Sequence, residues 1–192
     1  MSVLDEILQA NERYAADFGA KSELSLPAKR GFAILTCQDP RLIPPDFAGF
    51  SEGDAVVIRN AGGRATDDAI RSLAISHKLL GTKEWLVIHH DDCGMELVTD
   101  EQLRDMWANS LETAKLDADG FHEVGTGSGT TESEYVNWHT IGDRTQAVVS
   151  DVTRIRNHPL VSRQIPIYGF LYDIKTGRLT EVPDATIAGK AG

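Results

Sequence analysis

The sequence predicts an α/β fold in which helices flank a central, mostly parallel β-sheet. Three short apolar runs, at residues 31–37, 54–59 and 84–90, have the length of strands and the continuous apolar character typical of strands buried on both faces. A helical pattern separates the second run from the third, and the succession of strand, helix and strand predicts a parallel pair. The 192 residues can enclose one core of ordinary size, so we expect a single domain over residues 1–192.

At the N-terminus, apolar residues recur at helical spacing. The stripe consists of Leu4, Ile7, Leu8, Asn11, Tyr14 and Phe18. Such a stripe predicts an amphipathic helix, which forms an N-terminal helical arm over residues 1–20. Because so small a sheet offers the arm little apolar surface, we expect its partner to be a second copy of the chain, in a homodimer or a higher homo-oligomer.

A helix is predicted between the second and third strands. Thr66 can cap it, Asp67 and Asp68 suit its positive end, and Gly81 stops it. Further helical patterns cover roughly residues 100–118 and 143–157.

The C-terminal part and one internal stretch complete the pattern. Residues 165–182 predict a strand, a Lys-Thr-Gly turn and a short returning strand. Residues 117–143 are rich in Gly, Ser and Thr and predict a long loop insertion, a type of segment that is usually functional or mobile. Within it, "GTGSGT" at 125–130 lacks the following Lys-Ser/Thr pair and the preceding strand of a phosphate-binding loop, so we interpret it as a flexible connection.

The composition limits the classes of partner. The chain has 29 acidic and 19 basic side chains, a formal net charge of -10, which disfavours binding to nucleic acid or to an anionic membrane surface. No basic stretch followed by an apolar one marks a secretory signal, and no apolar run is long enough to span a membrane. We therefore expect a cytoplasmic protein, in which a structural disulfide between the two cysteines is not expected.

Chemistry-bearing residues follow two of the predicted strands. Cys37 ends the first strand and precedes "QDPRL", whereas His90 ends the third and precedes "DDCG", which contains Cys93. Ligands gather at the carboxyl ends of parallel strands, so both clusters can open into one crevice. Two thiolates and one imidazole suit zinc, and three protein ligands leave a fourth position for water or substrate. His-x-x-Cys alone is a weak motif, but Cys-x-Asp-x-Arg on another strand strengthens it.

Three motifs, "CQDPRL", "VIRNAGG" and "HHDDCGM", in this order and spacing, resemble those of the β-class carbonic anhydrases, and most closely those of the short bacterial members. The resemblance covers residues 29–116 and, less specifically, 145–183. It implies one Zn²⁺ per subunit, bound by Cys37, His90 and Cys93. It also implies a catalytic pair, Asp39 with Arg41, and a substrate pocket shaped by the backbone of Ala61, Gly62 and Gly63.

The resemblance implies a zinc-dependent lyase that hydrates carbon dioxide reversibly to bicarbonate. Zinc lowers the pKa of bound water to about 7, and the resulting hydroxide attacks a small gaseous substrate. Asp39 would accept a hydrogen bond from this water while Arg41 holds the carboxylate. In the family, release of Asp39 by Arg41 lets the carboxylate displace the water and closes the site.

Two other functions stay open. The same scaffold serves carbonyl sulfide and carbon disulfide hydrolases, which use the same hydroxide attack and release hydrogen sulfide. Gln38 and Pro40 depart from the family pattern beside the catalytic pair, and Phe121 and Trp138 could line a narrow apolar entrance that favours such a substrate. The second alternative is a redox or zinc-sensing module, which requires a Cys37–Cys93 disulfide or a permanently closed site.

Several neighbouring residues have simpler interpretations. Asp39 before Pro40 is also a common helix start, with aspartate at the cap and proline in the first turn. His89 faces away from His90, because adjacent strand residues point to opposite faces, so it is expected to be packed rather than a ligand. Asp91 and Asp92 either prepare a helix near Cys93 or support the ligands. Histidines that could transfer protons, none of them favoured, are His122, His139 and His158.

Overall fold

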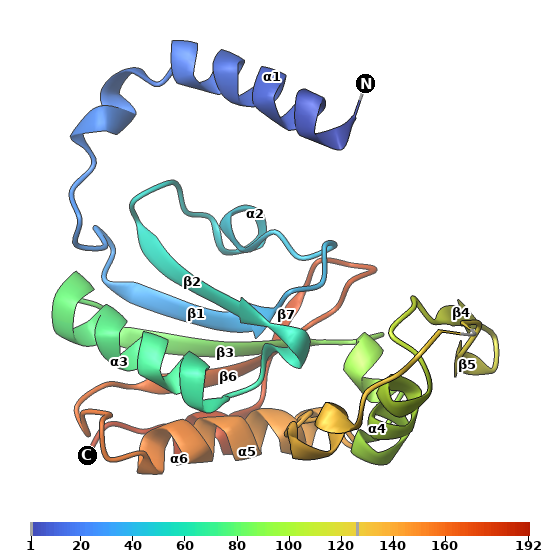
Figure 1. Cartoon of the computed structure of the whole chain (residues 1–192). Coiled ribbons are helices and arrows are strands. Elements are labelled where there is room, and N and C mark those ends of the chain that lie inside the picture. The colour runs from blue at the N-terminus through green and yellow to red at the C-terminus, as the bar shows by residue number, and fades with distance from the viewer. Residues whose placement is uncertain (1, 126) are drawn as a thin grey trace.

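The computed structural model describes residues 2–125 and 127–192, so residue 126 of the predicted loop at 125–130 lies outside the described residues. Its centre is a five-stranded sheet in the order β2-β1-β3-β6-β7 (Figure 1). The strands are β1 (Phe32–Cys37), β2 (Ala55–Asn60), β3 (Glu84–His90), β6 (Ile167–Tyr172) and β7 (Leu179–Glu181). The first four strands of this order are parallel, and β7 returns antiparallel to β6. The predicted α/β class and the strand–turn–strand at residues 165–182 are confirmed.

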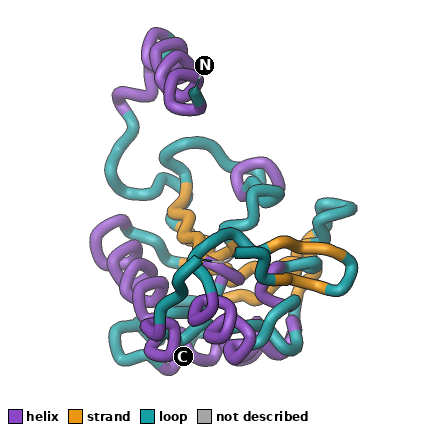
Figure 2. The backbone as a smooth tube through the Cα atoms, turned by 45° about the vertical axis from the view of Figure 1, so that its right-hand side comes forward, coloured by secondary structure: helices purple, strands orange, loops and turns teal. Residues whose placement is uncertain are grey.

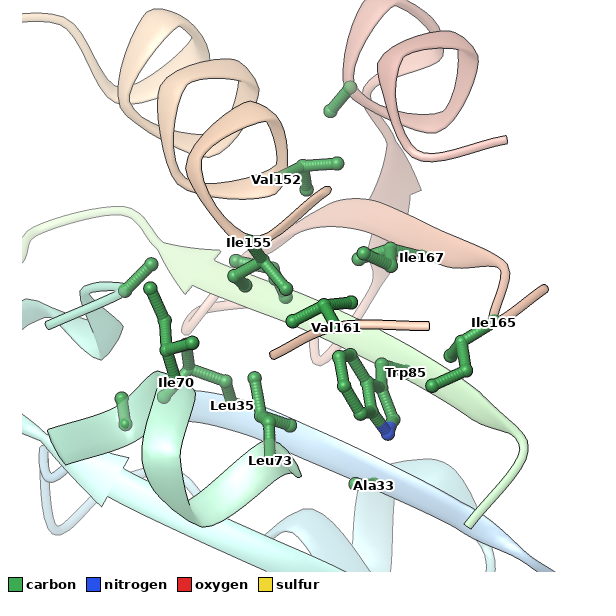
Figure 3. Packing of buried hydrophobic residues seen from close by; sticks show 14 of the residues in the cluster. Ala33, Leu35, Ile70, Leu73, Trp85, Val152, Ile155, Val161, Ile165 and Ile167 are labelled. Carbon is green, nitrogen blue, oxygen red and sulfur yellow. The ribbon is translucent and has the colours of Figure 1, made fainter. Parts of the chain in front are cut away.

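Three helices cover one face of the sheet. They are α3 (Asp67–Leu80), α5 (Arg144–Asn157) and α6 (Pro183–Ala188). Figure 3 shows their apolar side chains packed over β1, β3 and β6, with Trp85, Leu35 and Ile155 fully buried among them. A short helix that we did not predict, α2 (Pro44–Ala48), lies on the opposite side of the sheet (Figure 1). The main core therefore fixes the sheet, while the carboxyl ends of β1 and β3 open beyond it.

The helices begin and end where their capping residues predict. The Thr66 side chain accepts a hydrogen bond from Ala69 N, and α3 ends at Gly81 in the left-handed conformation. Asp143 caps α5 in the same way by accepting from Gln146 N. The helices predicted from Thr66 to Gly81 and over residues 143–157 are thus confirmed.

The N-terminal helix α1 (Val3–Ala16) is also confirmed, and it stands away from the rest of the chain (Figures 1 and 2). A capping box starts it, in which Ser2 and Asp5 exchange hydrogen bonds. None of its described residues is buried. The following turn η1 (Gly19–Glu23) is tied to the body by an ion pair of 2.9 Å between Lys21 Nζ and Glu52 Oε2. The arm thus presents its apolar stripe to solvent.

The helix predicted over residues 100–118 is shorter than expected. It forms α4 (Asp100–Asn109), after which β4 (Lys115–Asp117) and β5 (Gly120–His122) make an antiparallel hairpin. Asp117 Oδ1 accepts a hydrogen bond from Asp119 N, and Gly120 takes a φ of 111°, as a tight turn requires. The sequence Asp-Ala-Asp-Gly was the turn signal that the helical pattern obscured.

The predicted loop at 117–143 is not structureless. Besides β5 it contains a short helix, η4 (Thr131–Tyr135), and its glycines pack on the end of α4. A Cβ on Gly129 would overlap the Ala108 carbonyl oxygen, and Thr130 N donates to the Trp107 carbonyl oxygen at 2.8 Å. The glycines therefore allow a close approach that satisfies helix carbonyls. Among the described helices, none is long and apolar enough to cross a membrane.

Candidate metal centre

Three buried side chains, two at strand ends and one in the loop after β3, meet at the carboxyl edge of the sheet. Cys37 is the last residue of β1, His90 is the last residue of β3, and Cys93 precedes the short helix η3 (Gly94–Glu96). Their donor atoms all lie within 4.8 Å of one another. Cys37 Sγ and Cys93 Sγ are 3.9 Å apart, and both thiols are free. The structure thus brings together the three residues predicted as metal ligands.

The His90 ring is oriented for a ligand on its inner nitrogen. Nδ1 lies 2.8 Å from the Asp91 carbonyl oxygen, which can only accept, so Nδ1 carries the proton. Nε2 is then an acceptor, and it is buried with no hydrogen-bond partner among the described residues. A buried acceptor without a partner costs free energy unless something binds it. A metal ion among two thiolates and this nitrogen fits that requirement, and such a donor set suits zinc.

Electrostatics favour a thiolate at Cys37. A hydrogen bond from the Cys93 thiol is the largest effect, and it lowers the pKa of Cys37 to about 4 against the effect of burial. The His90 side chain lowers this pKa further, as do backbone hydrogen bonds from Asp39 and Gly62. The pKa of Cys93 is raised in turn, because it holds the proton beside the Cys37 thiolate. A cation that displaces this proton would be held by both sulfurs.

Asp39 and Arg41 form a two-pronged ion pair beside these ligands. Arg41 Nε lies 2.9 Å from Asp39 Oδ1, and Nη2 lies 2.7 Å from Oδ2. The Arg41 side chain lowers the pKa of Asp39 to about 2, although burial opposes it. Asp39 Oδ2 is also 3.8 Å from His90 Nε2, so the carboxylate faces the donor atoms. The ion pair is intact in this structure, and it holds the Asp39 carboxylate beside the Cys-His-Cys cluster.

The interpretation of Asp39 as a helix start is wrong. The nearest helix, α2, begins at Pro44 and has Ile43 at its N-cap. Asp39 instead closes a turn, in which its carbonyl accepts from Leu42 N and its carboxylate accepts from Arg41 N at 2.9 Å. The short loop after β1 thus serves to aim the carboxylate.

Two residues support the pair that the sequence did not single out for this purpose. Asp92, with a left-handed φ of 53°, accepts a hydrogen bond of 2.7 Å from Arg41 Nη1. Arg59, on β2, donates to the Cys37 and Asp39 carbonyl oxygens at 2.9 and 2.6 Å. The only sequence signal for Arg59 was a charge within an apolar strand at the edge of the sheet. The other aspartate, Asp91, accepts from Ile174 N, and only a short 3-10 turn follows Cys93 where a helix was expected.

The residues of the "NAGG" segment have two different structural roles. Ala61 and Gly62 line a cavity next to the candidate metal centre. Gly63 is not among the lining residues, because it packs under the end of β1 with a φ of 66°. A Cβ on Gly63 would lie 2.8 Å from Cys37 N and 2.8 Å from Thr36 C. Gly63 therefore sets how closely this segment approaches the first ligand.

His89 points to the other face of β3, as predicted for a packed residue. It is 1% exposed, and its Nε2 lies 3.1 Å from Asp151 Oδ2. Asp151 also pairs with Arg64 Nε at 2.8 Å, and Arg64 Nη1 donates to the His139 and Thr140 carbonyl oxygens. This buried network joins α5 to the segments on either side of the metal centre.

A cavity of about 720 Å³ opens from the metal centre. Cys37, Cys93 and Asp39 lie on its wall at one end, while α4 and the segment after it form the other end. Apolar side chains there are Leu103, Met106, Trp107, Leu111 and Phe121. Phe121 lines this cavity, whereas Trp138 packs on Trp107 at 4.9 Å between ring centroids and borders a separate hollow. The large apolar space suits small uncharged molecules.

Fold and site together define an α/β protein with a buried Cys-His-Cys cluster at the carboxyl edge of a parallel sheet. A sequence model of the carbonic anhydrase family matches residues 32–179. The chain belongs to this family and is an enzyme of it.

The relatives agree with this assignment. Beta-carbonic anhydrase 1 of Mycobacterium tuberculosis is 37% identical over 184 residues, which span 95% of this chain and 99% of the relative. Carbon disulfide hydrolase of an Acidianus species is 29% identical over 92% of this chain and 89% of its own length. The crystal structure of carbonic anhydrase from Streptococcus mutans superposes with a TM-score of 0.79 at 36% identity, covering 95% of this chain and 98% of that chain. The predicted resemblance is thereby confirmed.

Proposed function

We propose that the protein binds one Zn²⁺ per subunit through Cys37 Sγ, His90 Nε2 and Cys93 Sγ and hydrates carbon dioxide reversibly to bicarbonate. The observation that carries this proposal is the buried His90 Nε2, which has no partner among the described residues and lies beside two buried sulfurs. Support comes from the 37% identity to a mycobacterial protein named as a β-carbonic anhydrase. Three protein ligands leave one tetrahedral position open, as in catalytic zinc sites.

When bound, zinc would lower the pKa of a water molecule toward neutrality and so supply the nucleophile. The chain's own residues orient the reaction. Asp39 Oδ2 faces the donor atoms and accepts a hydrogen bond from the attacking water, while Arg41 occupies both carboxylate oxygens and keeps Asp39 in place. Asp91 fixes the His90 tautomer from outside. The apolar cavity admits an uncharged gas and keeps bulk water away from the reacting atoms.

Hydrolysis of carbon disulfide or carbonyl sulfide is the second candidate. It is favoured by the 29% identity to a protein named carbon disulfide hydrolase and by the aromatic lining from Trp107 and Phe121. Both gases are linear, and hydroxide would attack the carbon atom of each in the same way.

A paired gas assay decides between the two reactions. Zinc-loaded protein is given carbon dioxide in a stopped-flow assay with a pH indicator, and carbon disulfide or carbonyl sulfide with detection of sulfide. We expect hydration to dominate, and sulfide release that exceeds hydration by a wide margin would overturn the leading proposal. Asp39→Ala should abolish either reaction while zinc stays bound. Zinc-loaded wild-type protein that converts none of these gases would favour a redox or zinc-sensing module instead.

We also propose that α1 embraces a second copy of the chain, in a homodimer or a higher homo-oligomer that works in the cytoplasm. Val3, Leu4 and Ile7 are 71%, 63% and 58% exposed, and no described residue of the helix is buried. Exposed apolar stripes of this kind mark protein interfaces. A second copy offers the same stripe in a symmetric arrangement.

A further inference from the structure

The outer end of the cavity carries two carboxylates that the catalytic centre does not use. Glu112 follows α4 and Glu123 follows β5, and both line the same cavity as Cys37 and Cys93. In Figure 1, α4 and the β4–β5 hairpin lie together beyond the carboxyl end of β3. The carboxylates therefore flank the route between solvent and the metal centre.

Neither carboxylate is neutralised by the residues that the structure describes. No described cation forms a salt bridge with Glu112 or Glu123. Glu123 Oε2 is buried and lacks any hydrogen-bond partner among them. Asp39, the third acidic lining residue, differs because Arg41 pairs with it. Of the described residues that line the cavity, none is Lys, Arg or His. The lining thus carries a negative charge: Glu112 is exposed at the mouth of the cavity, whereas Glu123 is half-buried and its charge is less screened by solvent.

We propose that Glu112 and Glu123 determine charge specificity: they admit a neutral gas to the metal centre and repel anions from it. A linear neutral molecule carries no net charge and enters the apolar cavity without a penalty. Bicarbonate and competing monovalent anions experience repulsion from both carboxylates. The equilibrium between gas and bicarbonate stays unchanged, but the retention of anions at the centre falls. The inference rests on the proposed function only for the identity of the anionic product.

The two cysteines allow a test that needs neither metal nor gas. They are the only cysteines of the chain and both line the cavity. In metal-free, full-length protein, their alkylation rates are measured with iodoacetamide, which is neutral, and with iodoacetate, an anion of similar size. The ratio of the two rates reports the field, because a change in thiol ionisation alters both rates alike.

Glu112→Gln/Glu123→Gln should lower the iodoacetamide-to-iodoacetate ratio about tenfold, from Coulomb repulsion at an intermediate dielectric. Glu84→Gln/Glu181→Gln is the matched control, because both side chains are exposed on strands and outside the cavity lining. This control changes the net charge equally and should leave the ratio near the wild-type value. The proposal would be overturned if Glu112→Gln/Glu123→Gln, the cavity variant, had the same ratio as wild type. It would also be overturned if the ratio fell equally in the control variant.

A second measurement uses the metal-loaded protein. Thiocyanate, a linear anion, is titrated into cobalt(II)-substituted protein and followed by visible absorption, and the cavity variant should bind it about tenfold more tightly. In the gas assay, the KM for bicarbonate should fall while that for carbon dioxide stays constant. If the enzyme proves to hydrolyse carbon disulfide instead, the alkylation ratio still tests the charge specificity. A failure of the proposed hydration activity is therefore distinguishable from a failure of the charge proposal.

Discussion

Arg41 Nη1 donates to Asp92 Oδ2 at 2.7 Å, so the guanidinium that holds Asp39 is itself held from the loop after β3. Asp92→Asn should leave zinc binding intact and lower kcat by about two- to fivefold, since an exposed ion pair contributes at most about 1 kcal/mol. Stopped-flow hydration kinetics and zinc analysis check this. Asp105→Asn, on the exposed side of α4, should change neither quantity. A fall in zinc content in Asp92→Asn would show that the residue supports the ligands rather than Arg41.

Zinc content tests the ligand set directly. His90→Asn should reduce bound zinc from one per chain to a small fraction, because the buried Nε2 is the only nitrogen in the described cluster. The exposed His122→Asn should retain the full complement, since His122 binds only Asp117 on the surface hairpin. Elemental analysis after gel filtration gives both values. Equal zinc content in the two variants would contradict the assignment of His90.

The sequence predicted the sheet and the ligands because their signals are local. Buried parallel strands are continuous apolar runs, and Cys37, His90 and Cys93 stand at or just after strand ends, where topology alone brings them together. The caps are local as well, because the Thr66 and Asp143 side chains each accept a hydrogen bond from a backbone N–H three residues along the chain.

The segment after α4 could not be predicted from local pattern. The helix ends where the glycines near residue 129 fold back onto Trp107 and Ala108, a contact between residues about twenty positions apart. Asp92 and Arg59 were not predicted to hold the catalytic pair for the same reason. Their partners are set by strand register and by a left-handed turn, neither of which a helical or strand periodicity records.

Gly63→Ala should destabilise the protein strongly. The added Cβ would lie 2.8 Å from Cys37 N, and the backbone φ of 66° is unfavourable for alanine. We expect the free energy of unfolding to fall by at least about 2 kcal/mol. Gly142→Ala is the control, since a Cβ there meets nothing within 4 Å, and its effect should be within about 0.5 kcal/mol. Urea denaturation measures both. Equal stabilities would show that the segment can shift away from β1 without cost.

The apolar stripe of α1 can be tested by adding one charge. Ile7→Glu places a carboxylate in the stripe, where burial against a second copy would be costly, so we expect dissociation toward monomer. Gln9→Glu adds the same charge to the same exposed helix outside the stripe and should keep the wild-type assembly. Sedimentation velocity distinguishes the two outcomes. A monomeric wild type, well behaved at micromolar concentration, would contradict the proposed role of the arm.

The buried network around Asp151 should dominate stability on the other face of β3. Asp151→Asn leaves Arg64, whose side chain is 12% exposed, without its counter-charge, and we expect a loss of about 3 to 5 kcal/mol. Burial alone would raise the pKa of Asp151, but the hydrogen bond from His89 and the charge of Arg64 outweigh it and lower the pKa. A lowered folded-state pKa gives stability that is present above the unfolded value and is lost as the pH falls through the folded value.

The difference in the free energy of unfolding between wild type and Asp151→Asn should therefore have its largest value at neutral pH. It should shrink below about pH 4, the unfolded-state pKa of aspartate, as the pH approaches the lower folded value. Asp119→Asn, in the exposed hairpin turn, controls for the general effect of acid. Urea denaturation at several pH values gives the curves. A difference that is constant from pH 7 to pH 3 would show that the loss comes from altered packing and not from the missing charge.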